Sequence, residues 1–240
     1  SLFRLKPELV LKPKDAEDIK GVVRFLNENP GHSVTARAAG TDMTGGPLTN
    51  SLVLDVSSLN EIGEVSDFVR VGPGVFYRDL EIKTLKKGKL LPCYPASKNL
   101  CAIGGMVGNN CGGEKTLRYG KMEEFILESK YIFADGNEYE VKPLTREELD
   151  KKISQGDFEG NIYKNIFELV ERNKELVSEA KPKVSKNSSG YFLWNLWHKD
   201  RFDLNRLLVG SQGTLALMTE AKLRLENLKT HHDLVADRKS

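Results

Sequence analysis

The sequence predicts an α+β fold with two lobes. Over residues 1–60 a strand, a helix and two further strands follow one another, which is the order of a small parallel sheet with a right-handed crossover. Over residues 61–228 paired strand patterns joined by tight turns indicate a larger lobe with an antiparallel sheet flanked by helices. Each lobe carries a stretch of small residues without regular periodicity. A polar tail over 229–240 follows the second lobe.

The first lobe is predicted from clear start and stop signals. Residues 8–12 form a short apolar strand, and Asp15 then provides an N-cap for a helix over 16–28. Apolar residues along that helix follow the i, i+3, i+4, i+7 spacing, and the Asn-Pro-Gly that follows ends it. Further strands are predicted at 33–37 and 52–55.

The second lobe is predicted from hairpin and helix signals. A strand pattern at 125–134 meets 138–141 across Asp135-Gly136, which is a strong hairpin signal. Leu80 and Leu85 are expected to face the core. We predict the other strands at 62–65, 68–72, 207–209 and 215–225, and helices at 75–87, 145–153 (with a capping box at its start) and 161–177.

The stretch that organises the chain is PCYPASKNLCAIGGMVGNNCGGEKTLRYG, residues 92–120. Glycine has no Cβ, so its backbone can approach a ligand closely and adopt φ > 0. Apolar residues along the stretch argue against disorder, and a long ordered loop is usually functional. We therefore interpret it as a wall of main chain against which a flat or phosphorylated ligand packs.

A second stretch of small residues, RAAGTDMTGG at 37–46, follows a predicted strand. Successive backbone N–H groups in such a turn bind anions, and Thr41 and Thr44 add hydroxyl donors. This is the chemistry of a pyrophosphate site at the carboxyl end of a strand. We expect the two stretches to face each other, with the ligand in the cleft between the lobes.

Two other phosphate-binding patterns fit less well. Gly108 to Gly113 has the spacing of a P-loop, but Glu114 displaces Lys115 by one residue and no strand feeds the loop. Gly72-Pro73-Gly74 begins like a Rossmann fingerprint. Tyr77 stands where the third glycine belongs, and no acidic partner follows about 20 residues on.

Four segments occur in order: ARAAGTDMTGG, VGPGV, PASKNLCAIGGMVGNNCGGEKTLRYG and GSQGTLALMTEAKLRL. Together they resemble the FAD-binding domain of the FAD-linked oxidase family, which has the vanillyl-alcohol-oxidase type of fold. The resemblance covers roughly residues 7–225 and is greatest to D-lactate dehydrogenases and glycolate oxidase flavin subunits. It implies non-covalent FAD and the oxidation of a small-molecule 2-hydroxy acid by hydride transfer to flavin N5.

The resemblance also implies which residues bind the cofactor. Ala38 and Ala39 depart from the family, which usually has glycine there. The implied positions are Ala38, Ala39, Gly40, Thr41, Asp42 and Thr44 in the first stretch, Pro95, Ala96, Ser97, Cys101, Gly104, Gly105, Gly108, Asn109, Asn110 and Gly112 in the second, and Gly213 and Thr214 before the last strand.

The catalytic residues stay unknown, and no metal site is assigned. In the family, the base and the metal-binding histidines belong to a cap domain after the FAD domain, and the resemblance implies that the polar tail leads to such a domain, missing here. None of the four histidines, His32, His198, His231 and His232, falls in the small-residue stretches. Some relatives attach FAD through a histidine of the first loop, but alanine, glycine and threonine follow Arg37 here.

Composition and sequence patterns limit which partners, metal sites and cellular location we expect. The net charge of +2 gives no field that calls for nucleic acid. Cys93, Cys101 and Cys111 are odd in number, and their spacing fits neither a disulfide framework nor a zinc or iron–sulfur site. No signal peptide or long apolar stretch is present, so we expect a cytoplasmic protein that reaches a membrane only through partners.

Residues 181–197 are aromatic but not periodic, with Tyr191, Phe192, Trp194 and Trp197. They form either a packed surface loop or a segment that covers the flavin or docks a partner. Their Ser-Ser-Gly-Tyr resembles a segment of family members that carry iron–sulfur modules, which implies an iron–sulfur electron-transfer partner.

Three functional hypotheses remain open. The chain is the cofactor-binding part of an FAD-linked oxidase or dehydrogenase for D-lactate or glycolate. Alternatively, it serves a reductase of the peptidoglycan-precursor type, which would use NADPH. The third hypothesis is a flavin-carrying module without turnover of its own.

Overall fold

The computed structural model describes residues 3–184 and 187–229. In the first lobe, three parallel strands pair in the order β1-β3-β2. They are Leu9–Leu11 (β1), Val34–Arg37 (β2) and Leu52–Asp55 (β3), with a 3-10 turn at Val56–Ser58 after β3. Helix α1 (Ala16–Glu28) packs on one face of this sheet, and the Asp15 carboxylate caps it by accepting the Asp18 N–H. The predicted elements of this lobe are confirmed.

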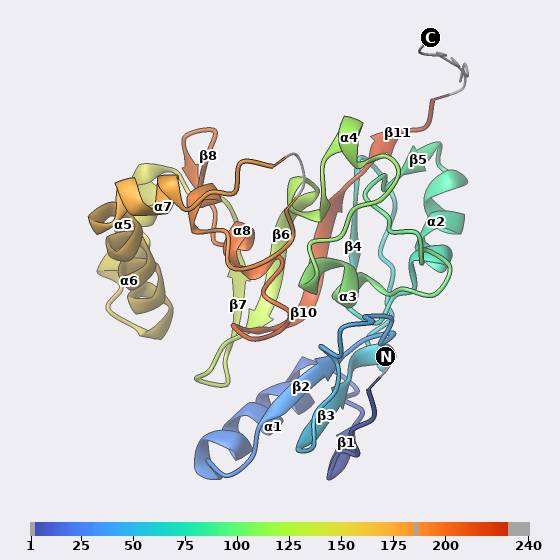
Figure 1. Ribbon diagram of the computed structural model, residues 1–240, viewed down its shortest axis with the longest axis horizontal. Coiled ribbons are helices and arrows are strands. Elements are labelled where there is room, and N and C mark those ends of the chain that lie inside the picture. The colour runs from blue at the N-terminus through green and yellow to red at the C-terminus, as the bar shows by residue number, and fades with distance from the viewer. Residues whose placement is uncertain (1–2, 185–186, 230–240) are drawn as a thin grey trace.

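In the second lobe, four antiparallel strands pair in the order β4-β10-β6-β7. They are Phe68–Val71 (β4), Ile126–Ile132 (β6), Glu138–Val141 (β7) and Leu217–Arg224 (β10). The predicted hairpin joins β6 and β7, and Gly136 adopts φ 77° in its turn. Figure 1 shows this sheet above the blue parallel lobe.

Helices and short strands flank the antiparallel sheet on two sides (Figure 1). On one side lie α2 (Tyr77–Leu85) and the strand pair β5 (Lys89–Leu90) and β11 (Glu226–Asn227). On the other side lie α5 (Arg146–Ser154), α6 (Phe158–Arg172) and α7 (Lys174–Glu179). The remaining elements are α3 (Ile103–Gly108), α4 (Thr116–Tyr119), α8 (Asn205–Leu208), the pair β8 (Trp197–His198) and β9 (Arg201–Phe202), and 3-10 turns at Met122–Glu124 and Leu193–Asn195.

The two lobes share part of their core. Ile19 and Leu54 of the first lobe are fully buried, and they cluster with Ile132 and Leu217 of the second. Two glycines bring the backbones still closer, because a Cβ on Gly72 would lie 2.1 Å from the Leu59 carbonyl oxygen and one on Gly74 2.3 Å from that of Val56. The Gly-Pro-Gly segment therefore serves close backbone packing.

Four predictions of local structure are wrong. Residues 62–65 form no strand, only an antiparallel bridge from Ile62 to Val71. Leu85 is 40% exposed because it is the last residue of α2, whereas Leu80 is fully buried as predicted. Residues 207–209 fall in and after the short helix α8, because a brief apolar run fits a buried helix as well as a strand.

The predicted helix over 161–177 is two helices. Asn173 ends α6 and begins α7, and its side-chain amide donates to the Leu169 carbonyl. This local hydrogen bond competes with continuation of the helix. The helix at 145–153 has its predicted capping box between Thr145 and Glu148.

From residue 230 onward the predicted polar tail, with His231 and His232, lies outside the described residues. None of the helices in the described part of the chain is long and apolar enough to span a bilayer. The division into lobes at residue 60 stays a prediction.

Candidate functional site

A cleft of about 910 Å³, open to solvent, lies where the lobes meet. The first wall is the end of β2 and the loop after it, Ala36 to Asp42 with Gly46 and Pro47. The second wall is α3, through Gly104, Gly105, Val107 and Gly108 with Asn109. The third wall is the turn after α8 and the start of β10, which includes Ser211, Gln212 and Gly213. The two small-residue stretches thus face each other, as predicted.

Asp42 shapes the first wall. Its carboxylate accepts the backbone N–H and the hydroxyl of Thr44, and also the N–H of Gly46 at 3.2 Å. Partial burial raises the pKa of Asp42, but these hydrogen bonds outweigh burial and hold the pKa below its ordinary value. The ionised side chain therefore folds the loop back on itself, and Gly40 takes φ 67° to make the turn.

Several backbone N–H groups of the cleft have no acceptor among the described residues, and those of Gly40, Thr41, Asp42, Gly105 and Gly213 are among them. Gly40, Asp42 and Gly213 are half-buried, and N–H groups with reduced access to water normally find a partner, whereas Thr41 and Gly105 are exposed. A diphosphate offers several acceptor oxygens, so this loop fits the phosphates of a dinucleotide without help from lysine.

The glycines of the second wall leave the cleft open. A Cβ on Gly105 would meet no atom within 4 Å, so packing within the protein does not require glycine there. Gly104 differs, since its Cβ would lie 2.9 Å from Pro73. The empty space beside Gly105 is a cradle that a side chain would fill.

Hydrogen bonds join the third wall to the second. The N–H of Gln212 donates to the Gly108 carbonyl at 2.9 Å, and the N–H of Gly210 donates to that of Val107 at 3.0 Å. Left-handed backbone at Gln212 (φ 55°) and Gly213 (φ 75°) forms the turn. The backbones of the two walls are therefore directly connected.

Tyr131 of β6 also lines the cleft. Its side chain is 3% exposed, and its hydroxyl is fully buried beside the Ser129 side chain, which also bonds Asn205. Burial raises the pKa of this phenol, so it stays protonated. Tyr131 therefore borders the cleft while it packs in the core of the second lobe.

Ten implied site residues line the cleft: Ala38, Ala39, Gly40, Thr41, Asp42, Gly104, Gly105, Gly108, Asn109 and Gly213. The others do not line it: Thr44, Pro95, Ala96, Ser97, Cys101, Asn110, Gly112 and Thr214. Whether any of them touches a cofactor stays a prediction.

The residues outside the lining have other contacts. Cys101 is 3% exposed in the core, Asn110 is fully buried, and a Cβ on Gly112 would meet the Thr116 hydroxyl at 2.3 Å. Residues 95–97 begin a turn in which the carbonyls of Pro95 and Ser97 accept hydrogen bonds. Thr44 and Thr214 bond to their own loops, and Thr214 also to Tyr191.

Sequence reasoning missed several lining residues. Ser211 and Gln212 lie inside the GSQGT segment that was singled out, so that segment held their signal. Tyr131 and Leu208 come from a strand and a helix with ordinary core patterns, and no local signal marks them.

Comparison with known families matches residues 7–142 to the family described as "FAD binding domain", which is more than half of the 240 residues. The chain belongs to this family. FAD is therefore its cofactor, and the resemblance read from the motifs is confirmed. In the part of the chain that the structure describes, no histidine or cysteine lines the cleft.

Curated relatives of this FAD-binding domain carry names of 2-hydroxy acid enzymes. It is 29% identical to the D-2-hydroxyglutarate dehydrogenase of Pantoea ananatis over 236 residues, 95% of this chain and 23% of the relative. It is 29% identical to the D-lactate dehydrogenase of Archaeoglobus fulgidus over 222 residues, 90% of this chain and 38% of the relative. The glycolate oxidase subunit GlcD of Bacillus subtilis is 25% identical over 93% of this chain and 38% of the relative. The chain therefore spans less than half the length of each.

Solved structures share the fold. The 6-hydroxy-D-nicotine oxidase of Arthrobacter nicotinovorans superposes with a TM-score of 0.62 at 18% identity, over 94% of this chain and 38% of that one. An alkyldihydroxyacetonephosphate synthase gives 0.61 at 15% identity, over 92% of this chain and 32% of that one. The predicted α+β architecture of an FAD-binding domain is confirmed.

Proposed function

We propose that FAD lies in the cleft and that the chain is the flavin-binding part of a dehydrogenase or oxidase acting on a 2-hydroxy acid. The observation that carries the placement is the cluster of unpaired N–H groups at Gly40, Thr41 and Asp42, opposite the open cradle at Gly105. The substrate class is supported by the relatives' names, which refer to D-2-hydroxyglutarate, D-lactate and glycolate.

The residues of the cleft bind and orient the cofactor. The first-wall N–H groups receive the diphosphate, and Asp42 holds their loop in place. When bound, FAD supplies a site that accepts a hydride from the substrate carbon.

Among the described residues, none that lines the cleft is suited to act as a base for the substrate hydroxyl. Its titratable lining residues are Arg37, Asp42 and Tyr131. Asp42 has a lowered pKa and is a weak base, while Tyr131 has a raised pKa and stays protonated. This favours the third hypothesis, a flavin-carrying module that does not turn over alone and receives its base from a cap domain or another subunit.

We also propose an iron–sulfur electron-transfer partner, because the Ser-Ser-Gly-Tyr segment at 188–191 resembles a segment of family members that carry iron–sulfur modules. The reductase of the peptidoglycan-precursor type is tested together with the main proposal, because NADPH would reduce its flavin.

The test begins with FAD itself. The purified chain should be yellow or become so with added FAD, and acid should release intact FAD at about one equivalent. With a cap domain or subunit present that supplies the base, D-lactate, glycolate or D-2-hydroxyglutarate should bleach the flavin without oxygen, and NADPH should not. Rapid bleaching by NADPH alone would favour the reductase. A chain that never takes up FAD would overturn the placement.

A further inference from the structure

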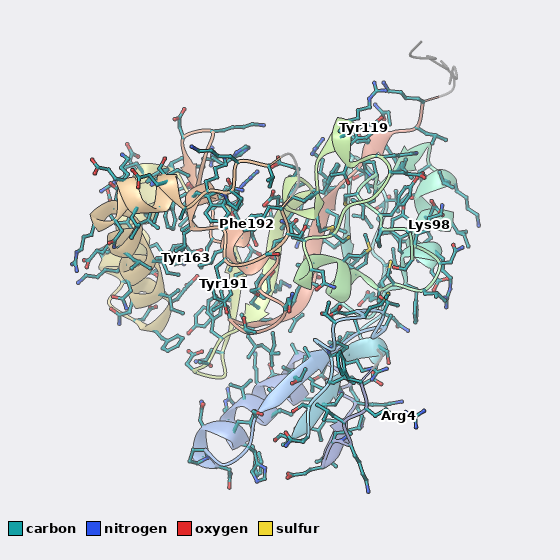
Figure 2. All side chains as sticks on the ribbon, viewed as in Figure 1. Arg4, Lys98, Tyr119, Tyr163, Tyr191 and Phe192 are labelled. Atoms are coloured by element: carbon teal, nitrogen blue, oxygen red, sulfur yellow. The ribbon has the colours of Figure 1, made fainter. Side chains whose placement is uncertain are left out.

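Residues 187–195, which we call the strap, contact residues next to the second and third walls. Figure 2 labels two of the strap's residues, Tyr191 and Phe192, between the α5–α7 helices and the central sheet. The Ser188 hydroxyl donates to the Asn110 carbonyl at 3.5 Å, next to the cleft-lining Asn109. The Tyr191 hydroxyl bonds the Thr214 hydroxyl at 2.8 Å, next to the cleft-lining Gly213. The strap thus bonds residues adjacent to both glycine-bearing walls.

Lys121 holds the strap. Its side chain is 13% exposed, and its ammonium donates to the Asn187 carbonyl and lies 4.4 Å from the centre of the Phe192 ring. The ammonium also pairs with Glu123 at 3.4 Å, and that carboxylate accepts from Asn195 at 3.5 Å. One buried ion pair therefore fixes both ends of the strap.

The Lys121–Glu123 pair is also connected to the second wall by a hydrogen bond from the backbone of Glu123. The Glu123 N–H donates to the side-chain oxygen of Asn110, which is fully buried and in the left-handed region at φ 44°. Walls made of glycine have few side chains of their own to hold their shape. Their order depends on contacts from outside, and a pre-ordered site loses less entropy when a ligand binds.

We propose that the strap fixes the second and third walls in the shape that binds FAD, and that Lys121 is the positioning residue that pins it. Lys121 does not line the cleft, so it acts through Asn110 and Thr214. This inference rests on the proposed position of FAD.

The chain provides a matched control. Lys152 pairs with Glu159 at 2.7 Å, with side chains 22% and 9% exposed, and its ammonium lies 6.0 Å from the centre of the Tyr163 ring. The chemistry equals that of the Lys121 pair, but the control pair joins α5 to α6 and no residue of it lines the cleft.

The experiment compares the rate of FAD release from Lys121→Met/Glu123→Gln and from Lys152→Met/Glu159→Gln, followed by flavin fluorescence after dilution. Both double variants remove an ion pair without leaving a lone buried charge. We expect release from the Lys121 variant to be at least about tenfold faster than from the parent, which corresponds to about 1.4 kcal/mol. The Lys152 variant should release FAD at the parent rate even if its melting temperature falls.

Two milder variants cover the case in which the first does not fold. Tyr191→Phe removes one hydroxyl from a side chain that is 46% exposed, and release should be about threefold faster. Lys121→Arg keeps the charge, the donor and the ring contact, and should release FAD at nearly the parent rate. Equal rates of FAD release from the parent, Tyr191→Phe and the Lys121 variant would contradict the proposed role of the strap and leave the proposed function untouched. Equal acceleration in both double variants would show a general loss of stability and also overturn it. A parent that binds no FAD overturns the proposed function, and the strap with it.

Discussion

The aromatic core beneath α5 and α6 and the walls of the cleft are built in opposite ways. In the core, Phe202 is fully buried, and its ring centre lies 5.5 Å from that of Trp197 and 6.3 Å from that of Tyr163. In the walls, Gly105 leaves open space and backbone N–H groups lack partners. The core gains stability from side chains that are present, whereas the cleft gains its binding capacity from side chains that are absent.

Removing a core ring should have the largest effect on stability. Phe202→Ala deletes a ring that contacts three other aromatic rings and leaves a cavity, so we expect a loss of about 3–5 kcal/mol in the free energy of unfolding. Urea denaturation measures this. Folded Phe202→Ala protein should still bind FAD, since Phe202 lies outside the cleft lining. A loss below about 1 kcal/mol would mean that this core does not carry the stability assigned to it.

Replacing glycine by alanine should distinguish a glycine that packs tightly against backbone from one that lines the cleft. A Cβ on Gly113 would lie 2.2 Å from the Tyr94 carbonyl oxygen, so Gly113→Ala should cost about 1–3 kcal/mol through overpacking. Gly105→Ala meets nothing, and in a helix it should be neutral or stabilise the FAD-free protein by up to about 1 kcal/mol. Equal melting temperatures for the two variants would contradict the distinction.

The smallest of these effects concerns pH. The pKa of Asp42 is lowered in the folded state, so its stabilisation of the first wall is complete above the ordinary value of 3.8 and is lost as the pH falls through the lower folded value. The FAD affinity of Asp42→Asn should therefore be weaker than that of the parent by a constant factor from pH 8 to 5. The two affinities should converge only in strong acid. Convergence already near pH 6 would show that Asp42 does not titrate as described.

The sequence predicted local structure correctly where a residue acts through its immediate neighbours in the chain. Asp15 at the start of α1, Asp135-Gly136 in the hairpin and the Thr145 capping box all act within a few residues, and each was predicted correctly. Residues 207–209 were predicted wrongly, because distant packing decides whether a short apolar run is buried as a strand or as a helix. Leu85 was placed correctly in a helix but wrongly in the core, because it stands at the exposed end of α2.

The residues of the candidate site were likewise predicted where the signal is local and missed where it is not. Glycine-rich motifs identified most of the first and second walls, since the absence of side chains is itself a local signal. The place of Tyr131 beside the cleft and the contacts of Lys121 with residues 187–195 could not be predicted, because both depend on segments far apart in the chain.

The most direct test of the account is the FAD content and melting temperature of Gly105→Leu, with and without added FAD. The leucine would enter the open cradle, so the FAD-free variant should fold and melt near the parent. The parent should gain roughly 4 kcal/mol at a thousandfold excess of FAD over Kd, whereas Gly105→Leu should gain almost nothing and stay colourless. Lys151→Ala, an exposed change on α5, is the control that should behave as the parent within about 0.5 kcal/mol. A yellow Gly105→Leu protein that FAD stabilises like the parent would show that this wall does not face the cofactor.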